Sequence, residues 1–358
     1  DWQITKDSLY LDHNSLWITC QFKPMTSGTW KNSSGNRIWS TSAVNWEQSG
    51  AAYAFTKGAA AIFYNTGAGT VTLSGALAPS SVLVHNAATG NYTWTGTGSL
   101  TGSMKLTKKG AGSLTINTAN TFTGGTDLYA GTIKIGKVTA LGTGKINLLG
   151  GTLNLSSLAP TNTITLSGNA LISNGANYKG SFSMTAGTLK TGSVLGIASG
   201  KTATIKGGTI CGTISGAGST AIAGQVNLTN GSITTSKLTI YSGNKLNVTQ
   251  AKGLVAAKNI QMGTGGKLSS AGPLSATSLS ASGNSLVTIS GAYPRAVSIA
   301  DTATLSNSGM NLDGYLTAKN LTLSSGRLYQ HNSANGIKVT NKLTMGSGST
   351  LSTGAALS

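Results

Sequence analysis

The sequence of 358 residues predicts an all-β protein, a β-solenoid preceded by a small aromatic-rich β region. Three observations lead to this fold class. Short segments alternate apolar and polar residues and end at glycine, similar phrases recur along the chain, and the long second part contains few large side chains. A narrow coil interior is filled by stacked Leu, Ile and Val, whereas a wide sandwich needs bulkier residues. No stretch has a helical periodicity long enough to predict a helix.

The predicted strands are short and have one buried face. Apolar residues alternate with Thr, Ser, Asn or Lys over three to five positions, which is the period-2 pattern of a half-buried strand. Examples lie at residues 153–155, 163–166, 237–240, 245–248 and 320–323. Glycine or an Asn-Gly or Ser-Gly pair closes each strand, because these residues permit the positive φ of tight turns.

The recurring phrases favour a solenoid over a sandwich or a barrel. A small residue followed by Gly-Thr and Leu or Ile begins at residues 130, 150, 186 and 207, with spacings of 20, 36 and 21 residues. Spacings of this size are typical of stacked repeats. The longer interval accommodates either a long turn or a coil that lacks the phrase.

Composition divides the chain near residue 95. All six tryptophans precede residue 95, and residues 1–95 have a net charge of +1. Residues 96–358 are poor in aromatic residues and have a net charge of +17. We therefore expect an aromatic-rich N-terminal β region or cap at 1–95 and a β-helix at 96–358.

Residues 106–135 carry the most specific pattern in the chain. They read LTKKGAGSLTINTANTFTGGTDLYAGTIKI. The ordered positions are Leu106, Thr107, Lys108, Gly110, Gly112, Leu114 and Ile116, then Asn120, Thr121, Phe122, Gly124, Gly125 and Thr126, and finally Gly131, Thr132 and Ile133. This segment closely resembles the autotransporter-associated β-strand repeat, also called the passenger-associated transport repeat.

The resemblance implies a right-handed parallel β-helix in the extracellular passenger of an outer-membrane autotransporter from a Gram-negative-type bacterium. In such passengers the repeat is thought to assist folding during export, and many passengers are adhesins. The family contributes no catalytic residues. Because the chain starts at Asp1 and still has a solenoid-like pattern at its end, we expect a mature or trimmed piece of a longer precursor. The translocator barrel of that precursor is then an expected partner.

The scarcity of acidic residues restricts the chemistry. The chain has seven carboxylate side chains, of which only Asp127, Asp301 and Asp313 follow residue 100. Glycan-cleaving enzymes use carboxylate pairs, and oxygen-ligand metal sites need several carboxylates together. We therefore expect no catalytic residues, no metal and no cofactor. The alternative is a secreted mucin- or glycan-active hydrolase with a carboxylate pair drawn from Asp7, Asp12 and Glu47.

The lysines are the candidate binding residues. They recur through the second part, and residues one coil apart stack in a solenoid, so we expect lysine ladders that bind acidic glycans or other polyanions. The candidates are Lys134, Lys145, Lys190, Lys201, Lys206, Lys237 and Lys245. The alternative is that the charge serves solubility. Nucleic acid is disfavoured, since no aromatic residues interleave with the lysines and arginine is scarce.

The N-terminal tryptophans allow two interpretations. Core packing of the N-terminal cap is the first, because terminal repeats need capping and a small cap needs large side chains. A sugar-stacking surface built from Trp30, Trp39 or Trp46 is the second.

The sequence thus predicts a non-enzymatic cell-surface adhesin and stalk. We expect weak, multivalent and salt-sensitive binding to mucin, acidic glycans or other host and bacterial surface polymers. We expect no direct insertion into a membrane, since no apolar segment approaches about 20 residues. A purely structural or self-associating spacer is the remaining alternative.

Overall fold

The computed structural model describes residues 24–175, 177–250, 254–290, 296–331, 336–354 and 357–358, and the backbones of four short strands before residue 24. The chain divides into two compact units. The N-terminal unit comprises residues 1–126 and 139–144, and the C-terminal unit comprises residues 127–138 and 145–358. All regular elements in the described residues are strands, which confirms the all-β prediction. No helix among these residues has the length and apolar character needed to cross a membrane.

The N-terminal unit contains the strands up to β16. They are β1 (Trp2–Gln3), β2 (Leu9–Asp12), β3 (Ser15–Ile18), β4 (Gln21–Phe22), β5 (Ser27–Trp30), β6 (Ile38–Trp39), β7 (Val44–Gln48), β8 (Ala51–Ala54), β9 (Ala60–Phe63), β10 (Gly69–Leu73), β11 (Ala76–Leu77), β12 (Ser81–His85), β13 (Tyr92–Thr95), β14 (Ser99–Leu100), β15 (Lys105–Lys109) and β16 (Ser113–Ile116). Strand β17 (Thr126–Leu128) begins at the last residue of the first segment of this unit.

The C-terminal unit contains the remaining strands. They are β18 (Thr132–Ile135), β19 (Ile146–Leu148), β20 (Thr152–Asn154), β21 (Ile164–Leu166), β22 (Ala170–Ser173), β23 (Phe182–Met184), β24 (Thr188–Gly196), β25 (Thr202–Asn230), β26 (Ser232–Ile240), β27 (Lys245–Val248), β28 (Leu254–Met262), β29 (Lys267–Ser270), β30 (Leu274–Ser282), β31 (Leu286–Ile289), β32 (Ala296–Ser306), β33 (Gly309–Leu312), β34 (Tyr315–Ser324), β35 (Arg327–Gln330), β36 (Ile337–Met345) and β37 (Thr350–Thr353).

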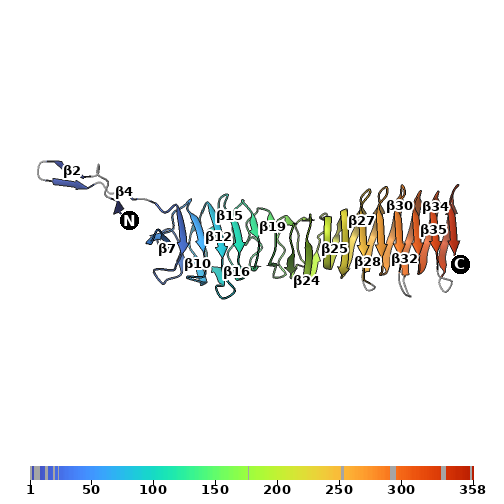
Figure 1. The fold of residues 1–358 in the computed structure, drawn as a ribbon, viewed down its shortest axis with the longest axis horizontal. Coiled ribbons are helices and arrows are strands. Elements are labelled where there is room, and N and C mark those ends of the chain that lie inside the picture. The colour runs from blue at the N-terminus through green and yellow to red at the C-terminus, as the bar shows by residue number, and fades with distance from the viewer. Residues whose placement is uncertain are drawn as a thin grey trace. The chain divides into compact units, whose positions relative to one another are not determined.

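From β26 onward in the C-terminal unit, each strand pairs in parallel with the next strand but one. Long strands pair with long strands, as β26 does with β28 and β28 with β30, and short strands pair with short ones, as β27 does with β29 and β29 with β31. Figure 1 shows these strands side by side, from β27 to β35. Each coil from β26 onward therefore contributes one long strand and one short strand to a parallel β-solenoid, as predicted.

The interior of this solenoid consists of columns of apolar side chains. One column runs through Leu246, Leu268, Val287, Met310 and Leu328, which are paired in register and at most 1% exposed. Within each short strand, buried residues alternate with less buried ones. The period-2 pattern of the sequence is therefore the inside–outside alternation of the coil. Burying an aliphatic side chain of this size stabilises the fold by about 1.5–3 kcal/mol. Stacking thus supplies the core that no single coil can form.

The 36-residue interval between two of the recurring phrases contains a coil that lacks the phrase. Strand β22 fills it: Thr152 pairs with Leu171, and Leu171 pairs with Lys190. The phrase is therefore common at the turn before a strand, but a coil can form without it.

The N-terminal unit combines antiparallel and parallel pairing. β5 pairs antiparallel with β7, which pairs antiparallel with β8, and β5 also pairs in parallel with β9. Parallel pairing continues from β9 to β12 and from β10 to β13, and on to β15 and β16. Strands on both sides of residue 95 thus share parallel pairing, and a separate cap ending at residue 95 stays a prediction.

Candidate functional site

The first part of the repeat, residues 106–126, lies in the N-terminal unit and contains a buried lysine. Lys108 points inward from β15 and its side chain is 0% exposed. Its Nζ donates hydrogen bonds to the carbonyl oxygens of Lys109, at 2.7 Å, and of Gly110, at 3.0 Å. Burial lowers its pKa from 10.5 to about 8, because desolvation disfavours the charged form. The lysine of the repeat therefore holds the turn after β15 and is unavailable to an external polyanion.

The glycines that follow Lys108 allow the turn to approach the preceding coil. A Cβ added to Gly110 would lie 2.3 Å from the backbone oxygen of Asn86, and one on Gly112 would lie 2.2 Å from that of Ala87. Gly110 also has a φ of +73°, a backbone conformation that residues other than glycine rarely adopt. The side chain of Asn86 is buried in the same contact and donates to the carbonyl oxygens of Gly90 and Ser113. The spacing Gly-x-Gly thus reflects close coil-to-coil packing.

Asn120 links three segments of the N-terminal unit. Its side chain is 1% exposed, and its Oδ1 accepts hydrogen bonds from the backbone N–H of Leu100 at 2.9 Å and the hydroxyl of Thr118 at 3.2 Å. Its Nδ2 donates to the carbonyl oxygen of Ala140 at 2.7 Å. Because Leu100 and Ala140 lie 20 residues to either side, one amide satisfies backbone groups of the adjoining coils on both sides.

The Phe-x-Gly part of the repeat fills and closes the same region. Phe122 is fully buried. A Cβ on Gly124 would lie 2.3 Å from the backbone oxygens of Ser103 and Met104, although the backbone of Gly124 does not have a positive φ. Each of these positions is therefore fixed by packing within the solenoid, and the repeat segment has the properties of a stacking element.

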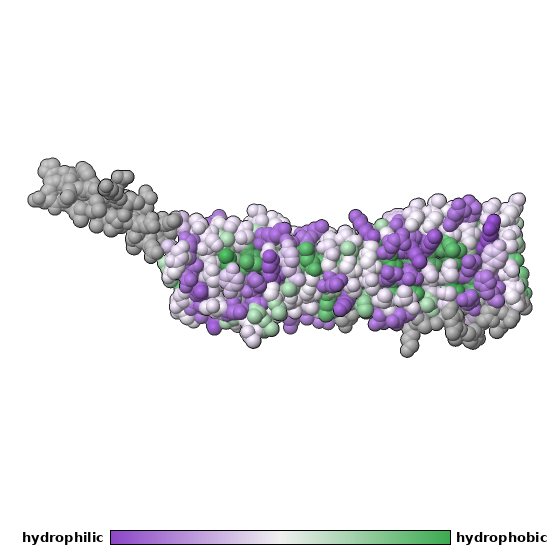
Figure 2. Space-filling model, viewed as in Figure 1, coloured by the Kyte–Doolittle hydropathy of each residue, from purple (hydrophilic) through white to green (hydrophobic). Residues whose placement is uncertain are grey.

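All seven lysines predicted as binding residues lie at the surface of the C-terminal unit. Lys134, Lys145, Lys190, Lys201 and Lys206 are exposed, and Lys237 and Lys245 are half-buried. None of the seven forms an ion pair with a residue that the structure describes. Figure 2 shows hydrophilic residues scattered over the visible face, with paler and hydrophobic patches between them.

The strand register tests which lysines are vertical neighbours. Lys245 on β27 pairs directly with Lys267 on β29. Lys134 pairs with Asn154, and Lys237 pairs with Ser219 and Asn259. The described pairings therefore stack one pair of lysines and otherwise place neutral residues beside them. The predicted lysines form a distributed basic surface in which no continuous ladder is recorded.

The tryptophans form a core cluster of the N-terminal unit. Trp30, Trp39 and Trp46 are each 0% exposed. The ring centroids of Trp39 and Trp46 are 5.1 Å apart, and that of Phe63 lies 5.3 Å from both. Edge-to-face and tilted contacts of this kind add to the stability gained by burial. None of these three indole rings is exposed, so their burial favours core packing over the alternative of a sugar-stacking surface.

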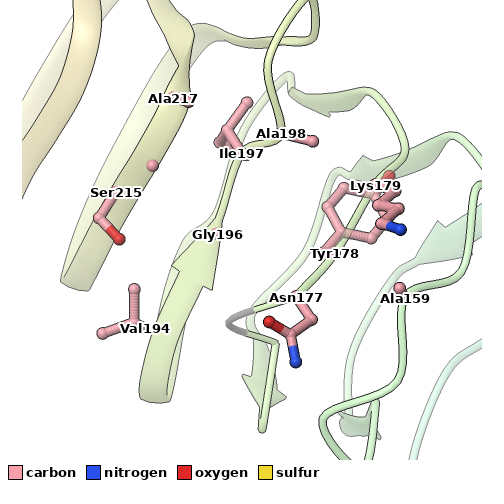
Figure 3. Close-up of a pocket in the computed structure, with 11 residues that line it drawn as sticks. Ala159, Asn177, Tyr178, Lys179, Val194, Gly196, Ile197, Ala198, Ser215 and Ala217 are labelled. Atoms are coloured by element: carbon pink, nitrogen blue, oxygen red, sulfur yellow. The ribbon is translucent and has the colours of Figure 1, made fainter.

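A shallow groove follows the coils of the C-terminal unit. Its first part, about 630 Å³, is lined by small and apolar side chains such as Val194 and Ile197, with Tyr178 and Lys179 beside them (Figure 3). The Tyr178 hydroxyl lies 2.6 Å from the backbone oxygen of Asn162 and 2.7 Å from that of Ser181, either of which can accept its single proton, so it holds neighbouring turns. Burial raises the pKa of this hydroxyl.

A second part of about 670 Å³ shares Gly216 and Ala217 with the first and includes Lys258. Sequence reasoning did not select Lys179 or Lys258 as binding residues. Lys258 lies between the paired residues Ala257 and Asn259, at the bend of a long strand, and alternation alone does not reveal where a strand bends. Neither part of the groove is lined by a carboxylate, histidine or cysteine.

Three of the carboxylates that the structure describes have separate structural partners. Glu47 lies 3.7 Å from the Lys31 ammonium. Asp127 accepts a hydrogen bond from Asn147 at 2.6 Å, and Asp301 accepts one from Asn320 at 3.2 Å. Of the three carboxylates from which the hydrolase pair would be drawn, Asp7 and the side chain of Asp12 lie outside the described residues. No group of three or more His, Cys, Asp or Glu side chains that could hold a metal occurs in the described part of the chain.

Comparison with known proteins adds one finding. Residues 106–135 match the family model of the passenger-associated transport repeat. No curated protein and no solved structure matches the chain. The matched segment contains the buried Lys108, the close-packed glycines and the bridging Asn120 described above. Residues 106–135 are therefore a passenger-associated transport repeat within a parallel β-solenoid, and this combination indicates a secreted or cell-surface autotransporter passenger.

Proposed function

We propose that this passenger is a non-enzymatic adhesin and stalk on the outer surface of a Gram-negative-type bacterium. It attaches to acidic glycans, such as those of mucin, through many weak contacts of exposed lysines. The observation that carries the proposal is the excess of +17 on residues 96–358 together with the surface positions of the seven predicted lysines. An unpaired positive surface attracts polyanions over about a Debye length, roughly 8 Å at physiological salt.

The distribution of these lysines favours long polymers as ligands. A single exposed lysine contributes little to binding in water. Lysines spread over many coils can contact successive acidic groups of one polymer, and such contacts add through avidity. We therefore infer that affinity depends on polymer length and falls steeply as salt rises.

The test is the binding of heparin and of mucin to the purified chain at increasing sodium chloride, compared with an uncharged polysaccharide. We expect binding of the acidic polymers alone, with affinity that falls at least tenfold between 50 mM and 300 mM salt. In a variant with Gln at Lys201, Lys206 and Lys237, both the affinity and its salt dependence should decrease. Acidic-polymer binding that is insensitive to salt would refute the electrostatic mechanism.

A matched control replaces three basic residues of the N-terminal unit, Lys31, Arg37 and Lys57, by Gln. This control loses the same formal charge but retains the lysines of the C-terminal unit. Equal losses in both variants would show that net charge acts without a preferred surface, as expected if the lysines serve solubility.

A further inference from the structure

A small polar hollow lies on the C-terminal unit, apart from the groove and from the predicted lysines. Its volume is about 370 Å³, and it is formed by the turns and first residues of β31, β33 and β35 in three successive coils. In the strand register, Gly309 lies between Leu286 and Arg327. Since Gly309 has no side chain, the outer surface is recessed between these two neighbours.

The lining of this hollow is polar and carries one charge. Every lining residue other than Leu286 and Gly309 has a polar side chain. Arg327 is exposed, and the paired residues Asn311 and Tyr329 are half-buried beside it. The side chains of these three residues form no hydrogen bond or ion pair with any residue that the structure describes. Their donors and acceptors are therefore available to a ligand.

One hydroxyl of the lining is buried and unpaired. Ser285 lines the hollow, is only 1% exposed, and its Oγ has no hydrogen-bond partner among the described residues. By contrast, the hydroxyl of Ser308 in the next coil donates to the carbonyl oxygen of Ala281 at 3.0 Å. Buried polar atoms are nearly always paired, so Ser285 adds an unsatisfied polar atom to the lining of the hollow, behind the accessible groups of Arg327, Asn311 and Tyr329.

We propose that this hollow binds one carboxylate-bearing sugar unit of an acidic glycan. A guanidinium matches a carboxylate by two parallel hydrogen bonds, which a lysine cannot provide. The amide of Asn311 can both donate to and accept from sugar hydroxyls, and the ring of Tyr329 offers an apolar face. The volume lies near the lower end of the range of about 300–1,000 Å³ for small-molecule sites, which suits one sugar ring.

This inference rests on the proposed function for the class of ligand, but it has a different physical basis. Attachment through the lysines is diffuse and depends on polymer length. Binding in the hollow depends on one arginine and one recess, so it is measurable with a monosaccharide that engages no array of lysines.

The test compares glucuronic acid with glucose, which have the same ring and differ at the carboxylate. Titrations of the full chain are followed by ligand-observed NMR and by calorimetry at 150 mM salt. We expect saturable binding of glucuronic acid at least tenfold tighter than that of glucose. Equal binding of the two sugars, or no binding of either, would overturn the proposal.

Two variants and a control locate the site. Arg327→Gln should weaken glucuronic acid binding at least tenfold, and Gly309→Val should abolish it by filling the recess. A Cβ on Gly309 meets only the flexible end of Leu286, at 3.2 Å, and valine favours strands, so Gly309→Val should fold normally, as circular dichroism would verify. Lys342→Gln removes one charge from β36 outside the hollow and should bind as the unsubstituted chain does.

The same variants separate this proposal from the general one. If Arg327→Gln loses the monosaccharide but keeps salt-sensitive heparin binding, both proposals are supported. If glucuronic acid binding is unaffected by either substitution, the hollow is not the site, whatever the behaviour of heparin.

Discussion

Replacing Asn120 by alanine should destabilise the N-terminal unit severely, because one buried amide serves the coils on both sides of it. The substitution leaves the N–H of Leu100 and the carbonyl oxygen of Ala140 without their partners. A buried polar group deprived of its partner costs about 1–3 kcal/mol. Adding the two gives an expected loss of about 2–6 kcal/mol in the free energy of unfolding.

Urea unfolding followed by tryptophan fluorescence measures this loss, since Trp30, Trp39, Trp46 and Trp94 are all buried in the same unit. The matched control is Thr121→Ala, an exposed neighbour at which a substitution should change stability by no more than about 0.5 kcal/mol. Equal midpoints for the two variants would refute the view that Asn120 bridges the coils.

The remaining predictions concern the repeat and the paired lysines. Because the pKa of Lys108 is about 8 in the folded chain and 10.5 when exposed, the unfolded chain binds more protons between these values, so stability should rise with pH there. The urea midpoint should increase from pH 7.5 to pH 10, and an equal increase in Lys108→Met would contradict this origin. Gly124→Ala should lower the thermal midpoint sharply because its Cβ overlaps two backbone oxygens, whereas Gly346→Ala, with its nearest atom at 3.5 Å, should scarcely change it. Lys267→Glu should stabilise the chain by about 0.2–1 kcal/mol at low salt through an ion pair with Lys245, and no gain would mean that the two side chains diverge.

Much of the solenoid was predictable because its physics is local. Alternation in segments such as 245–248 and 320–323 marks which residues face inward, and these residues are strands in the structure. The repeat was predictable for a related reason: Gly110, Gly112 and Asn120 are each the residue type that a close coil contact or a buried backbone group requires.

The arrangement of candidate binding residues was less predictable. Successive coils differ in length, so the paired residues Leu246, Leu268, Val287 and Met310 lie between 19 and 23 positions apart. Register shifts at strand bends, such as that between Ala276 and Ser278, cause part of this variation. Lysines that recur at a constant spacing in the sequence therefore do not stack wherever a coil gains or loses a residue.

The sequence by itself determined the strands, their inward faces, the transport repeat and the excess of positive charge, because these depend on neighbours within a few residues or on composition. Only the tertiary structure decided which side chains from different coils meet. It placed Trp30, Trp39 and Trp46 in a core, set Lys245 beside Lys267, and brought Ser285 and Arg327 to one hollow around Gly309. These contacts depend on the register between coils, which is fixed by the sum of all turn lengths and bends along the chain.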